Sequence, residues 1–220
     1  MPTPHFRTVI FDCDSTLSAI EGIDELAAGR RDAIAVLTEA AMRGEVPLEA
    51  VYGQRLALIR PNREAVEALA EQYIAAAVPD ARTTVQELLG HGVRVKIISG
   101  GLRQAILPFA AWLGVPAADV AAVDIRFNDD GSYRGYDEAS PLGRSGGKRT
   151  VVTEWLATVP APVMMVGDGM TDLEARPAVD RFVAFAGVVD RPAVTAAADV
   201  VIRTPSLRPL LREVLHTPAG

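Results

Sequence analysis

The stretch Thr8–Thr16, with the sequence TVIFDCDST, constrains the fold of this chain more than any other. Residues 9–11 form a β-branched and aromatic run, which predicts a buried β-strand. Asp12 and Asp14 follow where that strand must end, because a carboxylate inside an apolar sheet loses its hydration without compensation. In open α/β sheets, ligands bind at the carboxyl ends of the strands. Two acids in that position can ligate a hard cation, attack an electrophile or exchange protons, and this stretch alone leaves all three uses open.

The rest of the chain alternates apolar strand patterns with amphipathic helix patterns. This alternation predicts an α/β fold, a doubly wound parallel sheet with helices on both faces. A turn signal at residues 128–131 also predicts a β-hairpin on either side of it. Further strands are expected over Val93–Ile98, Val120–Phe127, Pro162–Val166, Arg181–Phe185 and Asp199–Ile202.

Residues 18–77 form an all-helical block that interrupts the α/β pattern directly after the first strand. We therefore predict a core of residues 1–17 and 78–220 and a small inserted all-helical cap domain of residues 18–77. An insertion at the carboxyl end of a strand lies over the site and can act as a lid. Helices in this block are expected over residues 21–43, 47–59 and 63–76.

Three further stretches put polar side chains at the ends of predicted strands or the starts of predicted helices. Ser99 and Gly100 stand between a strand and a helix, and a hydroxyl beside free backbone N–H groups is a typical anion site. Lys148 begins a helix, where its charge opposes the helix dipole unless an anion binds there. Asp168 and Asp172 follow a third strand. Taken singly, the first two stretches are better explained by an ordinary N-cap and by a solvated lysine at a helix start, whereas the third favours a site over a tight turn.

Together with Asp12 and Asp14, these groups match the needs of phosphoryl transfer: a nucleophile, a proton shuttle, a clamp for negative charge and a metal. One carboxylate can accept the phosphoryl group, and a second can act as general acid and then as base. Four aspartates at one edge repel each other, and a hard divalent ion with oxygen ligands, commonly Mg²⁺, removes that repulsion. We therefore expect a Mg²⁺-dependent phosphoryl-transfer site.

The composition of the chain limits the partners and the cellular compartment expected for such a site. The net charge of −6 argues against a nucleic-acid surface, which requires clustered Lys and Arg. There is no apolar run of about 18 residues, so no membrane span is expected, and the N-terminus lacks the apolar region of a signal peptide. Cys13 is the single cysteine, which excludes an intrachain disulfide and favours a reduced, cytoplasmic setting. The oligomeric state, monomer or homodimer, stays open.

The stretches DCDST, ISGG, SGGK and GDGMTD resemble, in this order, the four motifs of the haloacid dehalogenase superfamily of phosphatases. The block 18–77 is similar to the cap of the phosphoserine phosphatase family. The resemblance implies a phosphoric monoester hydrolase that converts O-phospho-L-serine to L-serine and phosphate, in L-serine biosynthesis, through an aspartyl-phosphate intermediate. The closer similarity is carried by Glu21–Ala27, Met42, Pro47, Arg55–Ile59, Tyr136–Glu138 and Ser145–Lys148.

The resemblance implies a role for each motif residue of the core. Asp12 would take the phosphoryl group, and Asp14 would move the proton. Ser99, the backbone N–H of Gly100 and the catalytic Lys148 would hold the phosphate. The Mg²⁺ ligands would be Asp12, Asp14 through its backbone carbonyl, Asp168 and Asp172.

For the cap, the resemblance implies the groups that select the substrate. Arg55 would pair with the substrate carboxylate, a task that suits a guanidinium fork. Glu21 would bind the substrate ammonium group, and Met42 would contribute to the same pocket. Two positions depart from the family pattern, because Leu48 stands where an aromatic residue is usual and Val188 stands where asparagine is usual. Both departures concern selectivity and rate, and neither removes a reacting group.

Several alternative functions share part of this chemistry. The same chemistry can act on another small phosphomonoester, or can transfer the phosphoryl group to an alcohol instead of water. A non-catalytic phosphate-binding or metal-binding module predicts the loss of a motif residue, and none is lost. An ion-pumping ATPase also uses a phosphorylated aspartate, but it requires membrane helices that this sequence does not contain.

Overall fold

The computed structural model describes residues 4–27, 34, 36–37, 39–40, 43 and 45–215. Its centre is a six-stranded parallel sheet in the order β3-β2-β1-β6-β7-β8. This order is that of a doubly wound sheet, so the predicted fold class is confirmed. The strands are β1 (Thr8–Phe11), β2 (Arg94–Leu102), β3 (Val120–Val123), β6 (Val163–Gly167), β7 (Arg181–Phe185) and β8 (Val200–Ile202).

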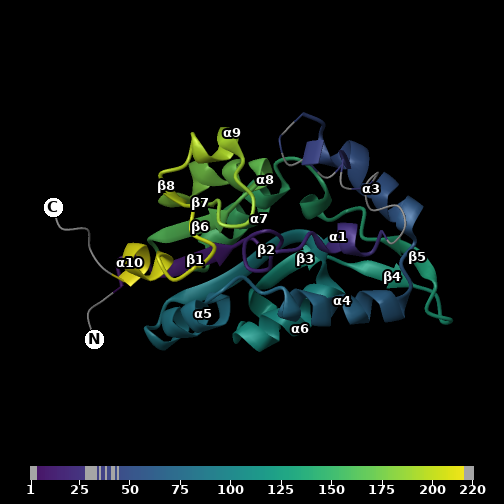
Figure 1. The fold of residues 1–220 in the computed structure, drawn as a ribbon, viewed down its shortest axis with the longest axis horizontal. Helices are drawn as coiled ribbons and strands as arrows, with labels where there is room; N and C mark the ends of the chain where they lie inside the picture. Colours follow the sequence, from purple (N-terminus) through teal and green to yellow (C-terminus); the bar gives the residue numbers. More distant parts are fainter. Residues whose placement is uncertain are drawn as a thin grey trace.

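Helices cover both faces of this sheet. Figure 1 shows α5 and α6 along one side and α7, α8 and α9 along the other. These helices are α5 (Ala81–Gly90), α6 (Arg103–Leu113), α7 (Gly147–Leu156), α8 (Met170–Leu173) and α9 (Pro192–Thr195), and α10 (Leu210–Leu215) packs on α5. None of the helices in the described part of the chain has the length and apolar character that a bilayer crossing requires.

Strand β1 lies at the centre of the sheet because its residues are apolar toward both helical layers. Val9, Ile10 and Phe11 are fully buried, as expected for a strand of a parallel sheet that is covered on both faces. Phe11 pairs with Ile97 of β2 on one side and with Val166 of β6 on the other. The carboxyl ends of β1, β2 and β6 therefore meet at one edge, where the winding direction of the sheet reverses.

The block 18–77 leaves and rejoins the sheet through two adjacent segments. Ser18 forms an isolated bridge with Ala77, and the backbone N–H of Ala19 donates to the carbonyl of Ala76 at 2.8 Å. The described helices of this block are α1 (Gly22–Glu25), α3 (Leu48–Ile59) and α4 (Arg63–Ala75). The predicted helix over residues 21–43 is described only in part. The division into a core and a cap domain stays a prediction.

The local sequence explains where α4 begins and which of its sides is buried. The Asn62 side chain accepts from the backbone N–H of Ala65 at 2.9 Å, which is an N-cap contact. The buried side of α4 carries Val66, Leu69 and Tyr73 and packs on α6. The predicted hairpin is present as a separate two-stranded sheet of β4 (Ile125–Phe127) and β5 (Tyr133–Tyr136).

Strand β2 differs from the prediction at its carboxyl end. It continues through Ser99 and Gly100 to Leu102, with a change of register against β3 after Ile98. The predicted end of the strand before Ser99 is therefore wrong, because the strand continues to Leu102 and α6 starts only at Arg103. The physical reason is that the buried Ser99 side chain has a partner in the core, so the backbone stays extended. The use of Ser99 and Gly100 as an anion site stays a prediction.

Candidate active site

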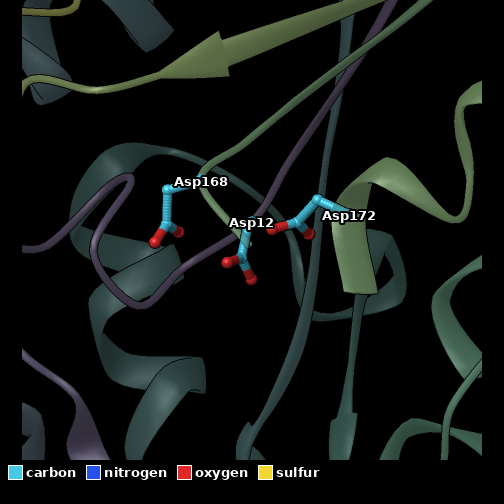
Figure 2. A group of neighbouring side chains, drawn as sticks. All are labelled: Asp12, Asp168 and Asp172. Atoms are coloured by element: carbon cyan, nitrogen blue, oxygen red, sulfur yellow. The ribbon is translucent and has the colours of Figure 1, made fainter. Parts of the chain in front are cut away.

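Three carboxylates gather at the sheet edge where β1 and β6 end. Asp12 directly follows β1, Asp168 directly follows β6, and Asp172 lies in α8. One ligand oxygen from each lies within 4.8 Å of the others, and all three residues are buried. Figure 2 shows the three side chains next to one another with their carboxyl groups close together. Gly167 permits this approach, because a Cβ atom there would overlap the Asp172 carboxyl group.

Lys148 provides positive charge within this cluster. Its Nζ atom lies 2.6 Å from Asp12 Oδ1 and 2.6 Å from Asp172 Oδ1. Burial alone would lower the pKa of Lys148, but the attraction of the two carboxylates outweighs burial, so its pKa is raised above the usual value. The cation at the start of α7 is thus balanced by carboxylates from two other elements, where the sequence argument placed a bound anion.

Asp12 shows that one lysine does not neutralise the cluster. The pKa of Asp12 is raised well above its usual value, mainly by burial and then by the charge of Asp172, although Lys148 acts in the opposite direction. Asp168 is paired with Arg191 and also accepts from the Thr16 hydroxyl at 3.1 Å. Three buried carboxylates with only oxygen donors are the ligand set that hard divalent cations prefer, so the cluster fits a divalent metal.

Asp14 lies beside this cluster with both carboxyl oxygens engaged. Oδ1 accepts from the backbone N–H of Gly22 at 2.7 Å and from the Tyr73 hydroxyl at 2.7 Å. Oδ2 accepts from the Ser99 hydroxyl at 2.8 Å. Donors from the sheet and from the block 18–77 therefore hold the same carboxyl group, which was not expected from the sequence.

The predicted phosphate-binding residues at the end of β2 lie next to Asp14. Ser99 accepts from the backbone N–H of Gly101 at 2.8 Å, in addition to its contact with Asp14. Gly100 lines the pocket, and its carbonyl oxygen accepts from the Tyr52 hydroxyl of α3 at 2.7 Å. This contact joins the end of β2 to the block 18–77 directly beside the pocket.

Arg55 closes the pocket from the side of α3. It is 3% exposed, and its guanidinium lies 3.0 Å from the Asp24 carboxylate. Its Nε–H group is buried and has no hydrogen-bond partner among the residues that the structure describes. Since a buried donor without a partner is costly, this group is suited to an anionic ligand.

Glu21 also lines the pocket and is held by a near neighbour. Its Oε1 atom accepts from the Ser15 hydroxyl at 2.7 Å. Burial, followed by the negative charge of Asp14, raises the pKa of Glu21 to about 7. Ser15 supports this contact from a backbone with φ of 54°, in the left-handed region that non-glycine residues rarely adopt.

The pocket lies between residues of the core and residues of the block 18–77. Its core side includes Asp12, Gly100 and Lys148, and its other side includes residues of the block 18–77. Among the predicted site residues, Met42 lies outside the described residues. Asp168 and Asp172 are not among the residues that line the pocket. The pocket is lined by Asp12, Asp14, Glu21, Ile23, Tyr52, Arg55, Gly100, Gly101, Leu142, Arg144, Lys148 and Thr171.

Comparison with known proteins agrees with this geometry. Residues 9–177 match the family model of the haloacid dehalogenase-like hydrolases. The phosphoserine phosphatase of Bos taurus is 41% identical over 194 residues, covering 87% of this chain and 86% of the bovine protein. The chain belongs to the phosphoserine phosphatase family of haloacid dehalogenase-like hydrolases.

Solved structures extend this similarity to the fold of the site. A substrate-bound phosphoserine phosphatase complex superimposes with a TM-score of 0.83 at 25% identity, covering 95% of this chain and 98% of the other. A phospho-aspartyl intermediate analogue of phosphoserine phosphatase gives a TM-score of 0.81 at 26% identity, covering 95% and 99%. Each of these two structures matches 95% of this chain, so the similarity extends over the sheet and most of the block between β1 and β2.

Several partners in the site were missed by the sequence argument. Tyr73, Arg191 and Asp24 contact Asp14, Asp168 and Arg55, respectively. Tyr73 and Arg191 stand in stretches without a recognised motif, so their roles depend on contacts between distant parts of the chain. Asp24 could have been found, because it lies in the same cap stretch as Glu21 and carries an acid that suits a buried arginine.

Proposed function

We propose that this protein is a Mg²⁺-dependent phosphoserine phosphatase, which hydrolyses O-phospho-L-serine to L-serine and phosphate through an aspartyl-phosphate intermediate. One observation carries the proposal: a single pocket is lined by Asp12 and Lys148 from the core and by Glu21 and Arg55 from the block 18–77. The first pair suits a phosphate ester, and the second pair suits the carboxylate and ammonium groups of an amino acid.

In the first step, a carboxylate oxygen of Asp12 attacks phosphorus, and the bond between phosphorus and the serine oxygen breaks. Lys148, the Ser99 hydroxyl and the backbone N–H of Gly100 hold the phosphoryl oxygens. Asp14 gives its proton to the leaving serine oxygen, so that L-serine departs as a neutral alcohol. The contact of Lys148 with Asp12 supports the place of the lysine beside the nucleophile.

In the second step, water attacks the phosphorus of the aspartyl phosphate. Asp14, now a carboxylate, accepts a proton from this water, and the bond between the Asp12 oxygen and phosphorus breaks. Inorganic phosphate is released, and both aspartates return to their starting state. The position of Asp14 in the pocket wall beside Asp12 supports its use in both steps.

Asp12, Asp168 and Asp172, with the backbone carbonyl of Asp14, would hold the metal, which we propose to be Mg²⁺. The metal supplies positive charge to the phosphoryl oxygens and to the crowded carboxylates. The raised pKa of Asp12 supports this need for further positive charge, since burial and Asp172 disfavour the ionised nucleophile.

In the cap domain of residues 18–77, Arg55 would bind the substrate carboxylate and Glu21 the ammonium group. The buried Nε–H of Arg55 supports the first role, and the placement of Glu21 in the same pocket supports the second. Met42, the lid function of the cap, the monomeric or homodimeric state and a cytoplasmic setting stay predictions.

A panel of phosphomonoesters with Mg²⁺, scored by phosphate release, tests this function. Phosphoserine should be the best substrate, and phosphoethanolamine, which lacks the carboxylate, should be hydrolysed far more slowly. Asp12→Asn is the control for contaminating phosphatases. Equal turnover of both esters would overturn the amino-acid specificity, and preferential release of a phosphorylated alcohol would favour phosphoryl transfer over hydrolysis.

A further inference from the structure

Tyr73 is a buried phenol in direct contact with the proposed proton shuttle. It lies in the last turn of α4, and its hydroxyl donates to Asp14 Oδ1 at 2.7 Å. A phenol ordinarily titrates near pH ~10, so at neutral pH this hydroxyl has one proton to donate. Its ring is fully buried. The contact therefore joins the cap helix α4 to a reacting group of the core.

The contact is one of three that fix the orientation of the Asp14 carboxyl group. The backbone N–H of Gly22 donates to the same oxygen, Oδ1, at 2.7 Å. The Ser99 hydroxyl donates to Oδ2 at 2.8 Å. With Oδ1 accepting two hydrogen bonds, the carboxyl plane is fixed, and Oδ2 lies at the end of β2, where it accepts from Ser99.

The surroundings of Tyr73 hold its hydroxyl in place. The ring stacks on Phe109 of α6 with centroids 5.8 Å apart and an angle of 19° between the planes. The Ser18 hydroxyl donates to the Tyr73 carbonyl at 3.0 Å, at the junction where the block 18–77 leaves the sheet. Gly22 has no side chain at the point where the phenol oxygen sits, and a Cβ atom there would overlap it.

We propose that Tyr73 is a positioning residue for proton transfer by Asp14. Its hydroxyl holds Asp14 Oδ1, so that the proton on Oδ2 faces the leaving oxygen of the substrate. This inference rests on the proposed phosphatase function and adds to it a residue that does not touch the substrate. The effect should appear only where the leaving group requires a proton as its bond to phosphorus breaks.

The role of Tyr73 can be tested by comparing two substrates whose leaving groups differ in their need for a proton. The serine oxygen is a poor leaving group and must receive the Asp14 proton, whereas p-nitrophenolate departs as an anion without one. Formation of the aspartyl phosphate can be measured separately from its hydrolysis as the pre-steady-state burst of the released alcohol. Rapid quench measures serine from phosphoserine, and stopped-flow absorbance measures p-nitrophenolate from p-nitrophenyl phosphate, both with the Mg²⁺-loaded protein.

For Tyr73→Phe, which keeps the ring and removes only the hydroxyl, we expect the serine burst rate to fall by about tenfold, part of the ~10²–10⁴-fold that a positioned acid contributes. The p-nitrophenolate burst rate and the KM for phosphoserine should stay within about twofold, because neither depends on this proton. Tyr133→Phe, which removes a phenol hydroxyl from strand β5, is the matched control and should change neither burst rate.

Equal slowing of both bursts would assign Tyr73 a purely structural role, and no slowing of either would also overturn the inference. If Tyr73→Phe does not fold, Gly22→Ala tests the same contact, because the added methyl group must displace the phenol oxygen, and the same difference between the two leaving groups is expected. If the unmutated protein does not release serine from phosphoserine, the proposed function is wrong. The burst comparison on the alkyl phosphomonoester that it does hydrolyse would then still decide the role of Tyr73.

Discussion

We call Asp12 and Lys148 of the pocket, with the adjoining Asp172, the core half, and Glu21 and Arg55 of the predicted cap the cap half; the two halves hold their charged side chains in different ways. In the core, Lys148 contacts both Asp12 and Asp172 directly, and the three residues come from different parts of the chain. In the cap, Arg55 is held by Asp24 and Glu21 by Ser15, each through its own contact. Direct contacts through Lys148 therefore join the core half into one charge network, whereas Arg55 and Glu21 of the cap half have different contact partners, and Asp14 and Asp24 also act on Glu21 through their charge.

This difference predicts how each half responds to change. Removing one member of the connected network leaves buried charges without compensation, so turnover and stability should both suffer. Removing one member of a separate pair should mainly weaken the binding of one substrate group. Variants of the core should thus change kcat and those of the cap should change KM, and the following experiments test this division.

The largest effect is expected for the nucleophile. Asp12→Asn should lower kcat for phosphoserine by at least about 10⁴-fold, because an amide oxygen cannot form the covalent intermediate. Phosphate release measures the loss, and circular dichroism checks that the variant is folded. Activity near that of the unmutated protein would show that Asp12 is not the nucleophile.

Lys148→Met should come next, with two linked effects. Turnover should fall by about 10²–10³-fold, the typical loss when a charged contact with the transition state is removed. The free energy of unfolding of the metal-free protein should fall by about 3 kcal/mol, because Asp12 and Asp172 lose their buried partner. Urea unfolding measures this loss. Added Mg²⁺ should restore more stability to the variant than to the unmutated protein, and an equal gain in both would contradict the connected network.

Arg55→Lys tests the cap half. Lysine keeps the charge beside Asp24 but loses the planar fork, so KM for phosphoserine should rise by about 10–100-fold with kcat within about threefold. Phosphoethanolamine has no carboxylate, and its kcat/KM should not change. A parallel loss with both esters would mean that Arg55 supports the chemistry rather than the recognition of the carboxylate.

The pH dependence of kcat/KM should show the ionisation of Glu21. With a pKa of about 7, Glu21 becomes protonated at lower pH and no longer binds an ammonium group, so kcat/KM for phosphoserine should fall about tenfold per pH unit well below 7. Glu21→Gln should remove this dependence while lowering kcat/KM at pH 8. If the fall in kcat/KM at low pH persists in Glu21→Gln, the ionisation of another group causes it.

The same pKa has a consequence for stability with a defined sign. The pKa of folded Glu21 lies above the ordinary value of 4.5, so the protonated form favours the folded state. This contribution is complete below pH 4.5 and is lost as the pH rises through 7. Urea unfolding across pH 5–8 should therefore show a smaller decline in Glu21→Gln than in the unmutated protein.

Ser15→Ala should give the smallest effect. It removes one hydrogen bond to Glu21, worth about 1 kcal/mol, so KM for phosphoserine should rise by about fivefold. Because this bond lowers the pKa of Glu21, the acidic limb of the pH profile should also move above pH 7. A loss in kcat instead of KM would contradict the separation of the two halves.

Much of the core half could be predicted, because its groups stand at the ends of strongly patterned strands. The apolar run 9–11 fixes β1, and parallel pairing then brings Asp12 and Asp168 to one edge. Ser99 shows the limit of this argument. A serine and two glycines after an apolar run are typical of a turn before a helix, yet the contact of Ser99 with Asp14 keeps the strand extended.

By itself, the sequence determined the doubly wound α/β fold, the acids at the ends of β1 and β6, and the helices α3 and α4 of the block 18–77. Local patterns suffice for these, because burial of apolar residues and the cost of burying charge act residue by residue. Only the tertiary structure decided which groups hold the acids: Tyr73 on Asp14 and Arg191 on Asp168. These partners are 59 and 23 positions apart in the chain, and packing alone, not periodicity, brings them into contact.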